Sequence, residues 1–317
     1  MRILKVEAQG SVYQRPAVVA GLALLCCALW GSAFPCIKIG YGLLNIEGAG
    51  SQILFGGYRF MLAGLITLAF ACVKKRSIVR VERSLIPYLI AQGLIQTAVQ
   101  YILYYIGVAH TTGSKGAVIN ASNTFFSIFF AHFLMKDEKI TLRKLLGCIV
   151  GFAGILIMNM GADPNGGSIT LLGEGFVLLS SLAYGLSSVT LKLLSRREDT
   201  TVITAIQFIF GSAVMIILGL MMGGRVAGFT LSSALLLLYL ALLSSLAFTI
   251  WGLLLKHNSV GRVAIYGFSI PVFGMFFSAL LLHESVLSVK NLAALLLVCA
   301  GIVIVNSLSR RQREKKA

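Results

Sequence analysis

The chain has 317 residues, of which 57% are hydrophobic and 12% are charged, and its mean hydropathy is +0.89. This composition excludes a single soluble domain, because soluble domains carry about twice that share of charged residues. The net charge of +16 would suggest a nucleic-acid partner in a soluble chain. In so apolar a chain it is expected to set membrane topology instead, and no nucleic-acid partner is predicted.

A membrane-spanning helix needs about 20 mostly apolar residues. Apolar stretches bounded by charge, Gly, Pro or Asn predict ten such helices, at residues 16–37, 52–73, 85–107, 113–135, 142–160, 171–193, 202–222, 232–255, 261–282 and 288–308. The first stretch is too long for the apolar part of a signal peptide, so we interpret it as a retained helix. The predicted fold class is therefore an all-α integral membrane protein.

The basic residues predict how these helices are oriented in a lipid bilayer. With a cytoplasmic N-terminus, all but five of the 27 basic residues fall in cytoplasmic segments. The exceptions are Lys38, Lys115, Arg225 and Lys290 in outer segments and Arg59 inside the second helix. Because Lys and Arg concentrate on the cytoplasmic side, both termini of this multi-pass protein are expected in the cytoplasm, with the plasma membrane as its location.

Arg59 has two interpretations. Its expected position close to the outer end of the second helix favours an anchor that snorkels to the headgroups. The alternative is a positive charge that faces an anionic substrate group.

The six cysteines lie within or beside apolar runs, without CxxC or Cys/His spacing, and are expected to act as small apolar residues. No metal site is predicted. No cofactor is predicted either, because neither pair of adjacent glycines in the expected loops is followed by the Gly-Lys-Ser/Thr of a phosphate-binding loop.

The two halves of the chain resemble each other. At an offset of 147 residues, the matched pairs include His110 with His257, Lys115 with Arg262, Ser122 with Ser269, Phe126 with Phe273, and Ala153-Gly154-Ile155 with Ala300-Gly301-Ile302. Upstream, at a slightly larger offset, Trp30-Gly31-Ser32 and Lys38 correspond to Tyr184-Gly185-Leu186 and Lys192. Each half holds five predicted helices, and since five is odd the second half must be inverted in the membrane.

This repeat predicts the organisation of the chain. A cytoplasmic segment (1–15) precedes a first repeat (16–160), and a second repeat (171–308) precedes a basic cytoplasmic tail (309–317). The fold expected is thus ten transmembrane helices built as two inverted five-helix repeats.

Several short motifs follow one another in the order of a known family. They are Ala28-Leu29-Trp30-Gly31-Ser32-Ala33-Phe34 with Lys38, Tyr58-Arg59-Phe60, Ser269-Ile270-Pro271 running to His283-Glu284, and Ala300-Gly301-Ile302. In these residues the chain resembles the EamA type of the drug/metabolite transporter superfamily over nearly its whole length. The resemblance implies a central cavity and transport of amino acids or related metabolites. The family often has Pro in the fourth helix, where this chain has Thr124, whereas Pro271 in the ninth helix is kept and is the predicted hinge.

Polar side chains in membrane helices usually face the bundle interior, so their spacing indicates a cavity. Gln92, Gln96, Gln100 and Tyr104 recur every four residues. The predicted substrate-binding residues are Trp30, Gln96, Gln100, Tyr104, Asn120, Asn123, Thr124, Tyr184, Ser188, Thr249, Trp251 and Ser269. Amides, hydroxyls and aromatic rings suit a small polar or zwitterionic solute. The alternative use is hydrogen bonding between helices, above all for the serines of the sixth helix.

The predicted function is a secondary transporter that works by alternating access, the two halves rocking about a midplane site. By resemblance, the solute is a small molecule such as an amino acid, and export is favoured. His132 is either a proton-responsive group or a locally hydrogen-bonded one. An enzyme is not expected, because the four histidines are dispersed without a carboxylate in the same span. A membrane enzyme acting on a lipid-linked substrate and a non-transporting receptor are the alternatives, and a monomer or homodimer is expected.

Overall fold

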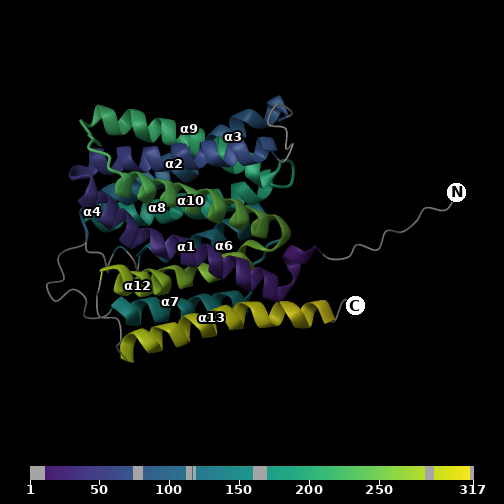
Figure 1. The fold of residues 1–317 in the computed structure, drawn as a ribbon. Coiled ribbons are helices and arrows are strands. Elements are labelled where there is room, and N and C mark those ends of the chain that lie inside the picture. The colour runs from purple at the N-terminus through teal and green to yellow at the C-terminus, as the bar shows by residue number, and fades with distance from the viewer. Residues whose placement is uncertain are drawn as a thin grey trace.

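The computed structural model describes residues 11–73, 81–111, 116, 119–159, 170–282 and 289–314. Within these ranges the regular elements are all helical, and they form a bundle of long, roughly aligned helices (Figure 1). Eight described helical segments are long and apolar enough to cross a membrane, as expected for an all-α integral membrane protein.

The helices follow the apolar stretches of the sequence. The α-helices are α1 (Pro16–Leu43), α2 (Gly48–Val73), α3 (Ile86–Gly93), α4 (Gln100–Ala109), α6 (Asn123–Leu134), α7 (Leu142–Asn159), α8 (Phe176–Leu194), α9 (Thr200–Met221), α10 (Leu231–His257), α11 (Val260–Ala264), α12 (Ser269–Leu282) and α13 (Val289–Glu314). Short 3-10 helices are η1 (Val12–Gln14), η3 (Arg83–Leu85) and η6 (Ile265–Phe268). Short π-helices are η4 (Leu94–Val99) and η5 (Leu171–Gly175). Each of the ten expected ranges contains helix in its described part.

Helix ends differ from the expected ones where a charged residue does not stop a helix. α1 continues past Lys38 to Leu43, and Asn45 then turns the chain with a positive φ of 48°. α2 begins at Gly48 rather than at residue 52. α13 continues as helix to Glu314, into the segment expected to be a tail. Parts of the expected helix at 113–135 lie outside the described residues, and α6 begins at Asn123.

Two of the spans are irregular at polar or proline positions. η4 is a π-helical turn that contains Gln96 and connects α3 to α4, and such turns occur most often at functional sites. η6 is a 3-10 turn between α11 and α12, directly before Pro271. Because proline has no backbone N–H, the carbonyl group one turn earlier loses its α-helical donor, which favours the tighter turn.

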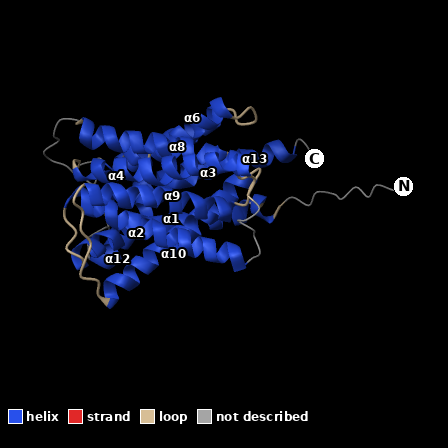
Figure 2. Cartoon of the chain, turned by 90° about the horizontal axis from the view of Figure 1, so that it is seen from above, coloured by secondary structure: helices blue, strands red, loops and turns tan. Residues whose placement is uncertain are grey.

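The helices pack in pairs that correspond to each other in the two halves. α1 packs on α10 and α12, whereas α8 packs on α4 and α6. α2 packs along α9, and α7 along α13, so that helices far apart in the sequence lie side by side (Figures 1 and 2). Each of these contacts joins a helix of the first half to a helix of the second.

Glycines bring the paired helices unusually close together. A Cβ atom on Gly31 of α1 would lie 2.6 Å from the Cβ of Phe273, and one on Gly185 of α8 would lie 2.5 Å from the Cβ of Phe126. Gly31 corresponds to Gly185 in the internal repeat, and Phe126 to Phe273. The same close approach is therefore made twice, once by each half.

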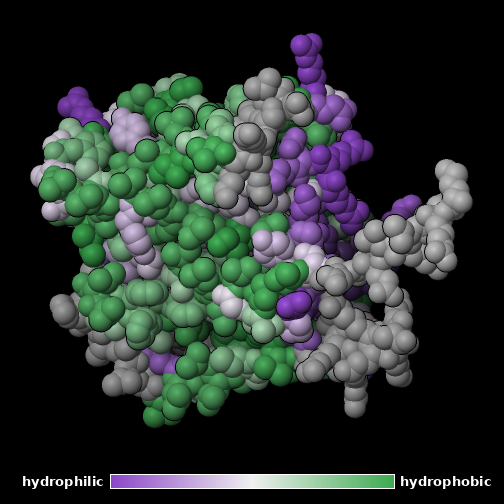
Figure 3. Space-filling model, turned by 45° about the vertical axis from the view of Figure 1, so that its right-hand side comes forward, coloured by the Kyte–Doolittle hydropathy of each residue, from purple (hydrophilic) through white to green (hydrophobic). Residues whose placement is uncertain are grey.

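The surface separates an apolar belt from a polar end. α1 begins and α13 ends at the same end of the bundle, here called the terminal end (Figures 1 and 2). Hydrophilic side chains gather toward this end in Figure 3, whereas hydrophobic side chains cover most of the described surface in the same view. An apolar belt of this kind suits a lipid environment, in which backbone polar groups are satisfied within helices.

We expect Gly31→Ala and Gly185→Ala each to lower the free energy of unfolding by about 1–3 kcal/mol, because overpacking forces the backbones apart. Thermal unfolding of the purified protein in detergent measures the change. Gly21→Ala is the matched control, since a Cβ atom on Gly21 would have nothing within 4 Å. Equal unfolding temperatures for all three variants would contradict this account of helix packing.

Candidate functional site

An aromatic cluster joins the two halves in the bundle interior. The indole ring of Trp30 on α1 lies edge-on to Trp251 and Phe248 of α10, at centroid distances of 5.0 and 5.2 Å. Trp30 is 9% exposed, and its Nε1 has no hydrogen-bond partner among the described residues. A buried indole N–H usually finds an acceptor, which makes this group a candidate for contact with a ligand. The structure thus brings together two of the predicted site residues that are 221 positions apart.

The glutamine stripe of the third span forms a hydrogen-bonded ladder. Gln92 Nε2 donates to Gln96 Oε1 at 3.1 Å, and Gln96 Nε2 donates to Gln100 Oε1 at 3.4 Å. The Gln92 end of the ladder is bonded to other helices, because Gln92 also donates to the Ser187 carbonyl on α8 and to Gln207 Oε1 on α9. Gln92 therefore acts between helices, whereas Gln96 and Gln100 continue the ladder within the span.

Hydrogen bonds place several other predicted residues. Asn123 Nδ2 donates to Asn120 Oδ1 at 3.2 Å, and Asn123 Oδ1 is buried without a partner among the described residues. Thr124 Oγ1 donates to the Ala264 carbonyl at 3.1 Å and so connects α6 to the end of α11. Ser188 Oγ donates to the backbone carbonyl of Tyr184, within its own helix.

Tyr104, Thr249 and Ser269 complete the predicted set. Tyr104 and Thr249 are half-buried, and the Tyr104 ring contacts that of Tyr105. Ser269 is buried and lines an apolar groove of about 780 Å³ between α1, α12 and α13, away from Trp30 and Trp251. The twelve predicted residues thus fall into several groups, of which the aromatic cluster and the amide ladder are the two largest in side-chain contacts.

His132 and Pro271 were predicted for a proton response and a hinge. His132 is half-buried near the end of α6, and its Nδ1 accepts a hydrogen bond from the Ile140 backbone N–H at 3.3 Å. Local hydrogen bonding was the second of the two roles predicted for His132 from the sequence. Pro271 lies in the first turn of α12, next to the 3-10 turn η6.

Arg59 is not a surface anchor. Its side chain is 2% exposed in the middle of α2, where Nε donates to Ser244 Oγ at 3.0 Å and to the Leu240 carbonyl at 3.3 Å. The sequence interpretation was wrong because α2 begins four residues earlier than expected, which places Arg59 deeper than a snorkelling side chain can reach.

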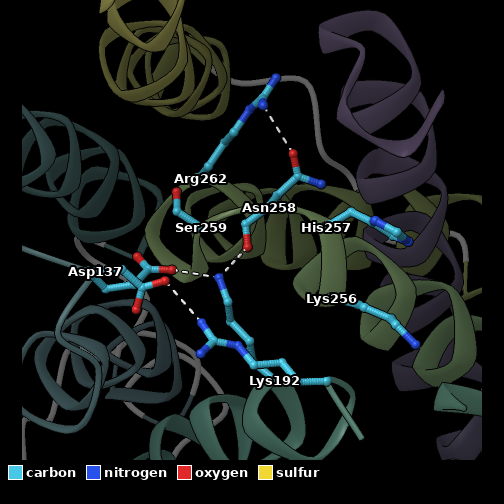
Figure 4. Close-up of a pocket in the computed structure, with 9 residues that line it drawn as sticks. Asp137, Lys192, Lys256, His257, Asn258, Ser259 and Arg262 are labelled. Carbon is cyan, nitrogen blue, oxygen red and sulfur yellow. Dashed lines mark hydrogen bonds and ion pairs between the residues drawn. The ribbon is translucent and has the colours of Figure 1, made fainter. Parts of the chain in front are cut away.

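A polar pocket of about 370 Å³ lies at the terminal end (Figure 4). Lys192 Nζ forms an ion pair with Glu138 Oε1 at 2.7 Å and donates to the Asn258 carbonyl. Glu138 also accepts from the Val260 backbone N–H at 2.6 Å and lies 3.5 Å from Lys144 Nζ. The ion pair therefore joins the end of α8, the segment after α6 and the connection between α10 and α11.

A second layer of bonds extends this pocket to the first described residues. Arg262 Nη1 donates to Asn258 Oδ1 at 3.0 Å, and Arg262 Nη2 donates to the Gln14 carbonyl at 3.4 Å. Asn258 Nδ2 donates to the Tyr13 carbonyl at 2.8 Å. We call Glu138, Lys192, Asn258 and Arg262 the polar cluster. It joins the ends of α8 and α10 to the first described residues.

Sequence comparison places this architecture in a family. The sequence profile of the EamA-like transporter family matches residues 18–160 and again residues 171–307. The chain belongs to the EamA-like transporter family. Membership makes it a transporter rather than an enzyme, and the twofold match accounts for the two similar halves.

Relatives of this EamA-like transporter are themselves named as transporters. An uncharacterized transporter of Bacillus subtilis (strain 168) is 26% identical over 288 residues, which cover 90% of each chain. A probable amino-acid metabolite efflux pump of Escherichia coli (strain K12) is 26% identical over 309 residues, 93% of this chain and 97% of that protein. A protein of known crystal structure, 15% identical, has a TM-score of 0.78 over 93% of this chain and 99% of its own, which shows a shared fold.

Sequence reasoning missed several functional candidates in this EamA-like transporter. Gln207 and Phe248 were overlooked because single polar or aromatic residues in apolar helices give no periodic signal. Glu138 and Lys192 gave no sign in the sequence that they would pair, and the structure joins them in an ion pair, with the Val260 backbone N–H donating to the same carboxylate.

We expect Lys192→Met to destabilise the EamA-like transporter by about 3–5 kcal/mol, because it leaves the carboxylate of Glu138 buried with much of its compensating positive charge removed. The double variant Lys192→Met with Glu138→Leu should recover part of that loss, since neither charge is then buried alone. Thermal unfolding in detergent tests both variants. A single variant as stable as the parent protein would show that the pair contributes nothing.

Proposed function

We propose that this EamA-like transporter exports an amino acid or a related small metabolite by alternating access. The observation that carries the proposal is the aromatic and amide-lined interior built from both halves. Trp30 comes from the first half, and Trp251 and Phe248 come from the second, and movement of other helices relative to α1 and α10 would change access to these rings.

Ten membrane crossings in two inverted repeats are the topology that we propose. The packing supports it: α1 contacts α10 and α12 as α8 contacts α4 and α6, and the contacts of Gly31 and Gly185 repeat each other. α1 begins and α13 ends at one end of the bundle, which requires an even number of crossings (Figure 1). Eight segments qualify as spans, and α6 and α7 supply the two further crossings.

The moving units that we propose mix helices of both halves. α1, α10 and α12 form one unit and α4, α6 and α8 the other, because these are the helices that pack closely together. The pairs α2 with α9 and α7 with α13 join equivalent helices and therefore lie at the pseudo-symmetry axis. The polar cluster bridges the two units at the terminal end, since Glu138 and Lys192 of one bond to Asn258 and Val260 at the end of the other.

We propose that the terminal end faces the cytoplasm of the cell that carries this protein in its plasma membrane. The basic segments of the sequence and the hydrophilic end of the surface in Figure 3 support this orientation.

The glycine face of α7 packs on α13, with a Cβ on Gly147 only 2.9 Å from the Gly301 carbonyl. This face is thus used within one chain, and a monomer or homodimer stays a prediction.

The solute class is inferred from the interior and from one relative. Indole rings and glutamine amides suit a zwitterion with an apolar side chain, and a relative in Escherichia coli is named a probable amino-acid metabolite efflux pump. Glu174, buried in the first turn of its span, accepts hydrogen bonds from Thr111 and from the backbone N–H of Thr170. Glu174 therefore caps the start of its helix. The coupling of transport is a separate question, and either proton coupling through His132 or exchange of solutes is compatible with this interior.

Transport by the purified protein in proteoliposomes tests the proposed function. Labelled amino acids and related metabolites are supplied at two imposed pH gradients, and uptake and efflux are followed. We expect saturable flux of one solute class, and its response to the gradient decides proton coupling. Solute that binds without crossing the membrane would favour the receptor alternative, and no binding or flux across the panel would overturn amino-acid export.

We expect Trp251→Ala and Gln100→Ala each to lower the kcat/KM of transport about tenfold or more, which corresponds to about 1.4 kcal/mol of lost binding. Both variants should still insert in the membrane, because each substitution leaves its span apolar and equally long. Leu246→Ala is the matched control, since Leu246 is an exposed residue of α10. Normal kinetics in both site variants would show that the cluster and the ladder do not bind solute.

A further inference from the structure

We propose that Arg59 binds the carboxylate group of the transported solute, which makes the substrate class organic carboxylates with an apolar side chain. The inference rests on the proposed transport function. It follows from a buried arginine side chain at the centre of the bundle, next to two buried hydroxyl groups and the aromatic cluster.

The first step concerns burial. Arg59 is 2% exposed near the middle of α2, a helix of 26 residues. Charged side chains at such a depth are costly and are found mostly where they pair with another charge or take part in function. Its burial also means that solute reaches the guanidinium group only after helices move, as alternating access requires.

The second step concerns the charge. Within the described part of the chain, the ion pairs join Lys144, Lys192 and Arg196 to Asp137 and Glu138, all at the terminal end, and none includes Arg59. Both hydrogen bonds of Arg59 to described residues come from Nε, to a hydroxyl and a carbonyl oxygen. The Phe60 ring lies 4.9 Å from the guanidinium carbon and adds a weak attraction. These contacts hold the side chain in place without neutralising its charge.

The third step concerns the geometry around the guanidinium group. The Tyr105 hydroxyl group packs 3.1 Å from the Cβ position of Gly56, about one turn before Arg59 on α2, and interacts with the guanidinium group, and the Tyr41 ring contacts Phe55 on the same helix. Within the described part of the chain, both hydroxyl groups are buried without a partner that meets hydrogen-bond geometry. A planar guanidinium group beside two hydroxyl donors matches the two oxygen atoms of a carboxylate. An amine would meet a positive charge at the same place. The site therefore selects the acidic end of an amino acid.

The fourth step concerns the rest of the solute. The Phe60 ring contacts Phe208 at 5.3 Å, Phe208 contacts Phe248 at 5.1 Å, and Phe248 contacts Trp30. An apolar wall thus runs from Arg59 to the aromatic cluster. A solute anchored by its carboxylate at Arg59 would place its apolar side chain along this wall, close to the indole rings.

A purely structural role explains these observations less well. A strut between α2 and α10 needs only one N–H group, and an uncharged glutamine could supply it. In the second half, α9 is the helix that corresponds to α2, and it contains no basic residue, so the repeated architecture forms there without an arginine. The charge is therefore an addition to the repeat rather than part of its packing.

Competition between matched ligands tests the inference in the full-length protein in proteoliposomes. Uptake of labelled L-leucine and L-phenylalanine is measured against unlabelled L-leucinamide and L-phenylalaninamide, which lack the carboxylate. We expect each amide to compete about 30-fold more weakly than its parent amino acid, and Arg59→Gln to lower uptake about 30-fold while removing this preference. Arg59→Lys should keep part of the preference because it keeps the charge.

Matched controls separate a binding role from a structural one. Arg225→Gln removes an exposed arginine and should change neither uptake nor preference. Ser244→Ala removes a hydrogen bond of Arg59 but not its charge, so a purely structural role predicts that it behaves like Arg59→Gln. Equal competition by amides and amino acids, or an unchanged preference in Arg59→Gln, would overturn the inference and leave transport itself intact.

Ligand-dependent thermal stability keeps the test decisive if no solute of the panel is transported. In detergent, the parent protein should be stabilised by the amino acids more than by their amides, and Arg59→Gln should show no such difference. That result would support the site while the transport proposal fails. No stabilisation by either member of the pairs, together with no flux, would overturn both proposals.

Discussion

In a lipid environment every polar group of this protein must be satisfied inside the bundle, and that constraint explains most of its internal arrangement. The glutamines of the third span bond to one another and, through Gln92, to α8 and α9. Lys192 and Glu138 neutralise each other at the terminal end. Against this background the exceptions stand out. Several buried side-chain atoms have no hydrogen-bond partner among the described residues, and three of them, Trp30 Nε1 and the hydroxyl groups of Tyr41 and Tyr105, lie in the region assigned to the solute.

The two similar halves account for the paired packing of the helices, and the positions at which they differ include the residues of the proposed site. The Gly31 contact with Phe273 and the Gly185 contact with Phe126 are equivalent, so both halves use the same device to bring helices together. Arg59 has no basic counterpart on α9, and Trp30 corresponds to Tyr184. An exact repeat would give a symmetric interior with two equal sites. The substitutions instead leave one positive charge and one pair of indole rings in the described interior, which is what a single oriented solute requires.

The sequence predicted the helices well because apolar length and charged boundaries are local properties. It also placed Trp30 and Trp251 in the bundle interior, where their rings are in contact. It failed on Arg59, because the depth of a side chain depends on where its helix begins, and glycines at positions 48 and 50 gave no sign that α2 starts so early. The partners within the polar cluster could not be predicted, because bonds such as that from Asn258 to the Tyr13 carbonyl depend on tertiary packing.

The proposed transport cycle would break some contacts of the polar cluster at the terminal end and keep others. In this cycle, opening of the terminal end would separate Lys192 from the Asn258 carbonyl and Glu138 from the Val260 N–H, while the ion pair between Lys192 and Glu138 would stay within one proposed unit. The two charges would then remain paired, and only bonds to backbone groups would be exchanged for water. Such an opening would cost far less than breaking a buried ion pair, whose loss would amount to several kcal/mol. A solute carboxylate bound to Arg59 would compensate its positive charge, which stays buried while the helices move. The loaded transporter would therefore change conformation at a lower free-energy cost than the empty one.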